Sequence, residues 1–364
     1  MRIITRYMLK ELGGPFLASL FILTVILAAG NIVQTADMVM NKGVEFIQVI
    51  KIFFLFLPYV LIFTIPISVL SAVLLGFGRL SSDNEVTALR TTGLNIYKLV
   101  LPVVICGFII SLMSVPLNDR VLPQSEFLAR KLLKTVGLKH PSAMLEPGVF
   151  VKGFKDYIIF IHDINGNIME DIRIYQPREN QATRTIVAQT GEIIPMPDRN
   201  SVKLKLNDGT ADEISAENPD EFFKLSFKDY HMILNLDDAV DISEIQKKPR
   251  EKSIKELLTD INGLNISGKG VIPLRIELHK KIALAFSNLV FVLVGIPLAI
   301  TTHRREKFIG FGLAIGMFLI YCGIMLTGIA LAIRGLIPPW IGVWTANILL
   351  FCTGIFLFRR VAKF

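Results

Sequence analysis

Six stretches of about 20 residues or more carry no formally charged side chain, and this feature constrains the fold most strongly. A helix needs about 20 apolar residues to cross a hydrocarbon core of ~30 Å, and helices in soluble cores rarely run so long without a charge. The composition agrees, because 52% of the residues are hydrophobic and only 19% are charged. The six predicted membrane spans are Leu12–Ala36, Ile52–Gly78, Leu99–Asn118, Ile282–Thr302, Phe308–Ile333 and Gly335–Phe358.

The net charge of +8 combines two different populations. Residues 118–275 hold 22 Lys or Arg and 24 Asp or Glu, a net charge of −2, so the apolar flanks carry +10. The flanking cations are dispersed between the apolar stretches and form no continuous basic stripe, which argues against nucleic-acid binding. We therefore predict two membrane halves of three helices each, with a near-neutral domain inserted between them.

The flanking cations also predict an orientation. Twelve of the 17 fall on alternate loops and at both chain ends, and the positive-inside rule places that side in the cytoplasm. Both termini are then cytoplasmic, and the central domain lies on the outer side of the membrane. The cations expected on the outer side are Lys42, Lys51, Lys280, Lys281 and Arg334.

The inserted segment changes from helical to β patterning. Residues 122–136 are compatible with a continuation of the third span. From about Val149 onward, short runs rich in β-branched and aromatic residues alternate with turn-forming residues at 153–156, 165–167 and 207–209. This pattern predicts an all-β sandwich or jelly roll. The expected strands are 149–151, 157–161, 172–175, 185–188, 202–206 and 222–227.

A short helix is expected where the chain leaves this domain. Ser253 is suited to cap a helix over Ser253–Ile261, and Glu256 stands at the capping-box position. Residues 272–281 then lead into the fourth span, with Pro273 near the helix start.

No sequence motif indicates an enzyme. The chain has no P-loop, dinucleotide fingerprint or nucleophile elbow, and its histidines and cysteines lack the spacing of a zinc site. Asp237, Asp238, Asp241 and Glu244 are interpreted as a solvated acidic stretch. We therefore expect no catalytic residue, no metal and no cofactor.

The loop between the second and third spans is the most informative segment. In residues 81–93, Ser82 or Asp83 is placed to cap a helix of two to three turns, and Gly93 is placed to end it. Its charges match the helix macrodipole. The helix is either an amphipathic connector at the headgroup level or a docking helix for a cytoplasmic partner.

The chain resembles a known family at several positions. Glu85-Val86-Thr87-Ala88-Leu89-Arg90 with Gly93 is similar to the coupling helix of the LptF/LptG (YjgP/YjgQ) permeases, the membrane part of the lipopolysaccharide-export ABC transporter. Further similarities are Ile4-Thr5-Arg6-Tyr7 with Glu11, Glu277-Leu278-His279-Lys280-Lys281, Gly295-Ile296-Pro297-Leu298, and Ile337-Pro338-Pro339-Trp340 with Trp344 and Asn347.

This resemblance implies a set of partners. An LptF-like chain pairs with an LptG-like chain on a dimer of the LptB-like ATPase, and periplasmic jelly rolls pass lipopolysaccharide to LptC-like and LptA-like bridge proteins. Residues 83–93 would then dock on the ATPase, with Glu85 as the charged contact and Ala88 and Leu89 as packing contacts. Asp83, Arg90 and Gly93 complete the predicted docking segment. ATP hydrolysis would belong to the partner subunit.

A cavity for lipid A needs an apolar wall and outer-side cations. Phe21, Phe318 and Met325 are candidates for the wall, although an ordinary lipid-facing or packing role is the commoner explanation for any one such residue. Lys42 and Arg334 are candidates for a phosphate contact, with interfacial snorkelling as the alternative. The resemblance favours Lys42, because family members carry basic residues near the outer end of the first span.

The predicted organisation has three parts. Residues 1–120 form spans one to three with the coupling helix 83–93, residues 121–270 form the periplasmic jelly-roll-like domain with flanking helices, and residues 271–364 form spans four to six. Two other functions fit the same organisation, a stand-alone secondary lipid transporter and a membrane-anchored periplasmic scaffold. The absence of charges within the spans argues against ion coupling, and six spans exceed what an anchor needs.

Overall fold

The computed structural model describes residues 2–40, 44–92, 96–139, 148–154, 157–165, 168–178, 181–196, 201–214, 222–235, 246–263, 270–302 and 307–363. The chain forms two compact units. The first, a helical unit, comprises residues 1–30, 56–127 and 247–364, and the second comprises residues 31–55 and 128–246 and contains the β-sheet.

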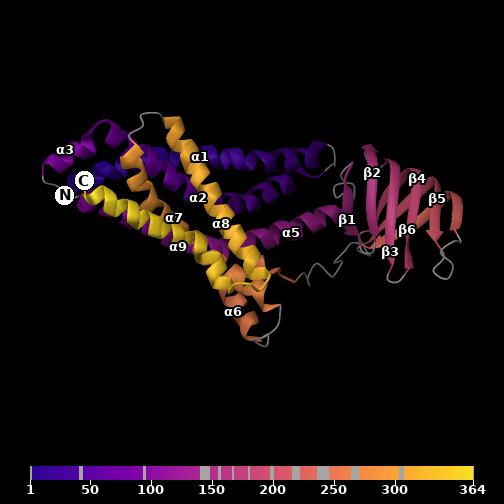
Figure 1. Cartoon of the computed structure of the whole chain (residues 1–364). Coiled ribbons are helices and arrows are strands. Elements are labelled where there is room, and N and C mark those ends of the chain that lie inside the picture. The colour runs from indigo at the N-terminus through magenta and orange to yellow at the C-terminus, as the bar shows by residue number, and fades with distance from the viewer. Residues whose placement is uncertain are drawn as a thin grey trace. The chain divides into compact units, whose positions relative to one another are not determined.

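Six helices are long and apolar enough to cross a membrane, as predicted. Four of them cover a whole charge-free stretch, whereas α4 ends two residues before Asn118 and α9 begins four residues after Gly335. In Figure 1, α3 (Glu85–Thr91), the start of α1 and the end of α9 lie at the same end of the helical unit. The six helices are α1 (Arg2–Met40), α2 (Phe46–Ser82), α4 (Ile96–Pro116), α7 (Val271–Thr302), α8 (Lys307–Ile333) and α9 (Pro339–Lys363).

Two of these helices form the centre of the helical unit. Most of the apolar stretch is buried in α2 and α7, whereas only a small share of it is buried in α1 and α8. Phe77 of α2, Phe291 of α7 and Tyr321 of α8 are fully buried in one hydrophobic cluster. The exposed surfaces of α1 and α8 are therefore available to lipid or to a second protein.

The last two spans are in backbone contact at a pair of glycines. A Cβ atom added to Gly328 of α8 would lie 2.0 Å from the carbonyl oxygen of Gly342 in α9. A Cβ atom added to Gly342 would in turn lie 2.5 Å from the carbonyl oxygen of Gly328. Small residues at such a crossing permit the close packing that associates helices within a membrane.

The third span continues as predicted beyond its apolar stretch. A π-helical turn, η1 (Leu117–Val121), joins α4 to α5 (Leu122–Lys139) without a break. The chain returns to the helical unit through a single 3₁₀ turn, η4 (Pro249–Glu251), and the short helix α6 (Ile254–Gly263).

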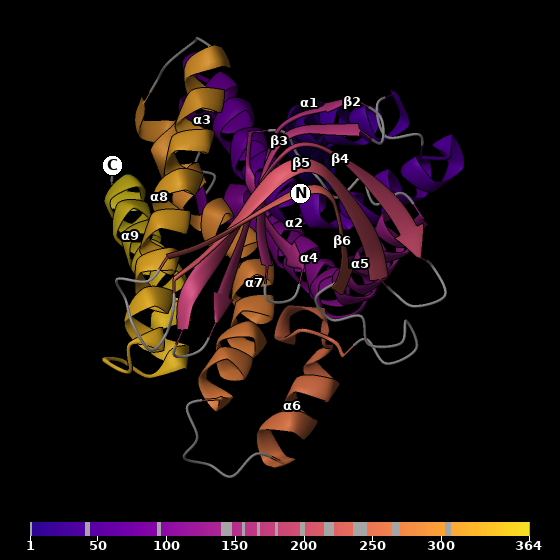
Figure 2. The ribbon, with the colours of Figure 1, turned by 90° about the vertical axis from the view of Figure 1, so that its right-hand side faces the viewer.

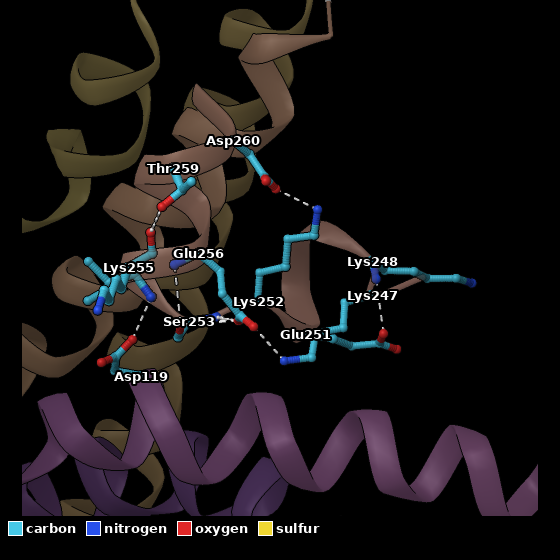
Figure 3. Close-up of polar contacts among 11 residues, drawn as sticks. Asp119, Lys247, Lys248, Glu251, Lys252, Ser253, Lys255, Glu256, Thr259 and Asp260 are labelled. Carbon is cyan, nitrogen blue, oxygen red and sulfur yellow. Dashed lines mark hydrogen bonds and ion pairs between the residues drawn. The ribbon is translucent and has the colours of Figure 1, made fainter. Parts of the chain in front are cut away.

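The predicted capping box of α6 is confirmed. The Ser253 hydroxyl accepts a hydrogen bond from the Glu256 amide at 3.3 Å, and the Glu256 carboxylate accepts one from the Ser253 amide at 2.7 Å (Figure 3). These reciprocal bonds satisfy backbone donors that a helix start otherwise leaves without partners.

The inserted domain is all β, as predicted. Its six strands form one antiparallel sheet in which neighbours in sequence are neighbours in space. Each predicted strand is found, and most extend further than their apolar runs. The strands are β1 (Phe150–Phe154), β2 (Tyr157–Asn165), β3 (Ile168–Arg178), β4 (Gln181–Met196), β5 (Ser201–Ile214) and β6 (Phe222–Asn235).

Alternating residues place the sheet's core on one face. Leu204 and Leu206 of β5 are buried together with Ile172 and Ile174 of β3, and they share one hydrophobic cluster. The alternation in residues 202–206 therefore predicted the buried face of this strand correctly.

The predicted turn at residues 207–209 is wrong, because these residues lie inside β5. Asn207 pairs with Asp229 and Gly209 pairs with Phe227, while Asp208 between them adopts a φ of 49°. The residues typical of a turn here instead mark a local break in strand pairing.

The same break crosses most of the sheet. Pairing is interrupted at Asp208, at the facing Gln189 of β4 and at the facing Asp171 of β3, which has a φ of 50°. Strand pairing also skips His162 of β2 and Lys228 of β6. We call these five residues the bend line; all are exposed, and Figure 2 shows the arched strands.

Candidate functional site

The helix α3 follows directly from the end of α2. Asn84 lies between them with a φ of 57°, a left-handed conformation that asparagine tolerates better than most residues. The Ala88 amide donates to the Asn84 carbonyl at 2.9 Å, so Asn84 is the residue that precedes the first helical residue. The expected cap at Ser82 or Asp83 is therefore wrong, because α2 continues through Ser82 and the chain reverses direction at Asn84.

One face of α3 anchors it to the helical unit. Val86 is 4% exposed and belongs to the same hydrophobic cluster as Phe77, and Leu89 packs against that cluster from its edge. Thr87 and Ala88 on the remaining surface are exposed. The helix thus has a buried base and a free face of small side chains.

The carboxylate of Glu85 is held by the first span. The hydroxyl of Tyr7 in α1 donates a hydrogen bond of 2.9 Å to Glu85 Oε2, and the pair is exposed to solvent. The sequence could not predict this contact, because 78 positions separate the two residues.

A second group of polar contacts joins α1 to the end of α2. The guanidinium group of Arg79 lies 2.5 Å from Glu11 of α1 and 3.7 Å from Asp83. Exposed ion pairs contribute little stability, so this cluster serves chiefly to fix geometry. Together with Tyr7 and Glu85, it connects the start of α1 to both sides of the α2–α3 junction.

A large cavity lies beside this cluster. It has a volume of about 1170 Å³ and is lined by α1, α2, α7 and α8, with Glu11, Arg79 and Asp83 among its lining residues. Gly14 and Gly310 also line it. The end of α1 that carries Tyr7 and Glu11 is therefore incompletely packed on one side.

Several predicted site residues cannot be placed. Gly93, Lys42 and the acidic stretch 237–244 lie outside the described residues. Arg90 lies within α3.

The predicted lipid-wall residues occupy two different environments. Phe21 of α1 is 72% exposed, whereas Phe318 and Met325 of α8 are 6% and 4% exposed and belong to the core. The ring of Phe318 contacts those of Phe291 and Tyr321. Arg334 is exposed directly after the end of α8.

Lys281, one of the cations predicted on the outer side, is buried against η1. Its Nζ donates to the Asn118 carbonyl at 3.0 Å, and the Asn118 amide donates to the Lys281 carbonyl at 3.0 Å. The neighbouring Lys280 forms an ion pair of 3.1 Å with Glu277. These contacts fix the start of α7 against the third span.

A second set of contacts fixes α6 and η4 against η1, α5 and α2. Asp119 of η1 accepts a hydrogen bond of 2.6 Å from the Ile254 amide (Figure 3). Arg250 lies 3.0 Å from Glu126 and over the ring of Tyr59. Burial tends to lower the pKa of Arg250, but Glu126 and Tyr59 outweigh it and leave that pKa above its ordinary value.

No group of three or more potential metal ligands occurs among the described residues. With six membrane-length helices, an inserted antiparallel sheet and a short helix anchored between two spans, the chain has the architecture of a polytopic membrane permease with an extramembrane domain.

The family model described as "Lipopolysaccharide export system permease LptF/LptG" matches residues 6–360. The chain therefore belongs to the LptF/LptG family. It is a multi-pass protein of the inner membrane, as predicted.

Individual relatives agree with this assignment. The chain is 24% identical to the lipopolysaccharide export system permease protein LptF of Escherichia coli (strain K12) over 358 residues, which covers 98% of this chain and 94% of the relative. The LptF protein of Shigella flexneri matches to the same extent. An uncharacterised protein of Rickettsia prowazekii (strain Madrid E) is 28% identical over 263 residues, 71% of each chain.

Proposed function

We propose that this chain is a permease subunit that extracts lipopolysaccharide from the inner membrane and passes it to a periplasmic bridge. The observation that carries the proposal is the family match over residues 6–360. In this function the chain pairs with a second LptF/LptG-like permease and delivers lipid to LptC-like and LptA-like proteins. It hydrolyses no ATP itself.

An LptB-like ATPase dimer supplies the energy by acting on the segment 83–93. The shape of α3 supports this role, because Val86 anchors the helix while Thr87 and Ala88 remain exposed. Glu85 provides a carboxylate at the base of this face, and Asp83, Leu89, Arg90 and Gly93 complete the docking segment. A force on α3 passes to the helical unit through Val86 and Leu89, which pack in its hydrophobic cluster.

The orientation of the chain in the membrane is inferred from the distribution of Lys and Arg residues. The basic loops, both termini and α3 are placed in the cytoplasm, and the sheet in the periplasm. In this orientation the exposed surfaces of α1 and α8 line a lipid cavity together with the paired permease. Phe21 contacts acyl chains there, Phe318 and Met325 support the wall from behind, and Lys42 and Arg334 lie near lipid phosphates.

The docking role is tested by reversing the charge of Glu85. We expect Glu85→Lys to weaken co-purification with the ATPase by at least about 30-fold, because the substitution reverses the charge of the predicted docking contact. The matched control is Glu45→Lys, an exposed glutamate before the opposite end of α2. Membrane insertion should be normal in both variants, and unchanged co-purification of Glu85→Lys would rule out the docking role.

Lipid delivery is tested with photo-crosslinking residues on the sheet. Positions on the buried face, such as Ile172, Ile186 and Leu204, should capture lipopolysaccharide only when ATP is present. The bend-line residues Gln189 and Asp208 are exposed controls. Failure at every buried position would favour a membrane-anchored scaffold instead.

A further inference from the structure

A second, smaller cavity lies on a different face of the helical unit. It is a groove of about 430 Å³ formed by α4, α7 and α9, near the end of α9. This volume is within the range of roughly 300–1,000 Å³ that small-molecule sites occupy. The groove shares no lining residue with the cavity beside α1.

The floor of the groove is apolar and tightly packed. Val104 of α4 and Leu293 of α7 line it, and Gly354 brings α9 close to α7. A Cβ atom added to Gly354 would lie 3.2 Å from the carbonyl carbon and 3.3 Å from the carbonyl oxygen of Leu293. This floor suits a hydrocarbon chain.

Two cations stand at the rim. Lys98 is in the first turn of α4 and Arg359 in the last turns of α9; both line the groove and both are exposed. Neither forms an ion pair with another residue that the structure describes. Both lie within three residues of the ends of the apolar runs Ile96–Leu133 and Pro339–Val361, which places them at the level of the lipid headgroups.

An aromatic pair forms part of the same rim. The rings of Tyr97 and Phe358 have their centroids 5.3 Å apart, and both residues line the groove. Tyrosine is enriched at the membrane interface, because its ring is apolar and its hydroxyl is polar. The groove therefore runs from an apolar floor through an aromatic zone to two cations, the same order as the parts of a phospholipid.

We propose that this groove binds an anionic glycerophospholipid from the surrounding leaflet, with an acyl chain on the floor and the phosphate between Lys98 and Arg359. Basic pockets between membrane helices recognise anionic headgroups in this manner. A protein helix is a poorer fit, because it would need acidic residues opposite both cations. The site is distinct from lipopolysaccharide export, because neither α1 nor α8 contributes to it.

The test measures lipid retained by the full-length protein, purified in mild detergent, by native mass spectrometry. The probes are phosphatidylglycerol and phosphatidylcholine with identical acyl chains. We expect one retained phosphatidylglycerol. Each cation near the surface contributes enough to change affinity about fivefold, so Lys98→Gln with Arg359→Gln should reduce the preference about 30-fold.

Two variants decide whether the groove itself is responsible. Arg360→Gln removes an adjacent exposed cation that does not line the groove, and it should leave retention unchanged. Val104→Trp fills the floor without changing any charge, and it should abolish retention. Retention that survives Val104→Trp, or that falls equally in Arg360→Gln and in the double variant, overturns the proposal.

Two further outcomes also overturn it. Equal retention of phosphatidylcholine and phosphatidylglycerol would describe ordinary annular lipid. Displacement of the bound phosphatidylglycerol by stoichiometric lipopolysaccharide would place the groove on the export route. Loss of the bound phosphatidylglycerol when the partner subunits assemble would show that the groove is a protein interface. The export function is unaffected by a negative result, because it is tested at Glu85 and on the sheet.

Discussion

The hydroxyl of Tyr7 donates a 2.9 Å hydrogen bond to the carboxylate of Glu85, so the first span holds the charged residue of the predicted docking helix. In the proposed complex the ATPase competes with Tyr7 for this carboxylate. The bond is exposed and connects α1 to α3. The nearby ion pair of Arg79 with Glu11 connects α1 to the end of α2. The strength of the hydrogen bond between Tyr7 and Glu85 therefore determines how readily Glu85 is released to a partner.

Replacing Tyr7 with Phe should strengthen binding of the ATPase. A hydrogen bond contributes about 0.5–1.5 kcal/mol net, so its loss in the free permease should raise the apparent affinity about two- to tenfold. A pull-down titration with purified ATPase measures this. Tyr97→Phe, which removes another tyrosine hydroxyl at this end, is the control, and weaker binding of Tyr7→Phe would show that the partner requires the pair intact.

Replacing Gly328 with Ala should destabilise the contact between α8 and α9. The added methyl group would meet the Gly342 backbone, and overpacking of this kind costs about 1–3 kcal/mol. The free energy of unfolding can be measured by titration of the full chain with a denaturing detergent. Gly323→Ala is the matched control on the same helix, because no atom lies within 4 Å of its added Cβ. Equal stability of the two variants would contradict the close crossing.

Replacing Asp119 with Ala should loosen the start of α6. The Ile254 amide would lose its 2.6 Å acceptor, at a cost of about 1 kcal/mol. Amide hydrogen exchange within α6 should then accelerate about fivefold. The control is Asp260→Ala in the same helix, which removes an ion pair with Lys252 just before α6. This variant should change amide exchange in α6 much less. Unaltered exchange after Asp119→Ala would mean that η1 does not support α6.

The stability of α6 should decrease in acid. Hydrogen bonds from Lys247 and from the Ser253 amide hold the pKa of Glu256 below its ordinary value. A carboxyl group with a lowered folded-state pKa stabilises the fold fully above its unfolded pKa, and this contribution is lost as the pH falls through the folded pKa. Exchange rates in α6, corrected for intrinsic pH dependence, should therefore rise below about pH 4.5. Glu256→Gln should flatten this profile, and a profile unchanged by that substitution would assign the effect to another group.

Local sequence patterns predicted the elements well and the contacts between them poorly. The six spans were evident because charges are costly within a bilayer, and the capping box of Ser253 and Glu256 is a signal four residues long. The 207–209 segment was misread as a turn because a left-handed Asp208 beside a glycine serves a bent strand as well as a turn. The predicted cap of α3 lies one or two residues too early, because α2 continues through Ser82 and the left-handed Asn84 directly precedes α3.

The contacts that build the candidate site depend on the tertiary fold. Tyr7 and Glu85 are 78 positions apart, and Asp119 and Ile254 are 135 apart. No periodicity relates such residues, since each pair meets only after separate helices pack. The burial of Phe318 and the exposure of Phe21 were likewise beyond prediction, because a uniformly apolar helix carries no polar face that shows which side is buried.

The bend line has a mechanical consequence for the sheet. The four pairings between neighbouring strands from β2 to β6 are all interrupted at the same register, so the five bend-line residues share one axis. Strand pairing resumes on both sides of that axis. A change of the angle between the two parts of the sheet would therefore disrupt the fewest strand pairs if it were concentrated at this axis, because no residue pair lies on the axis itself.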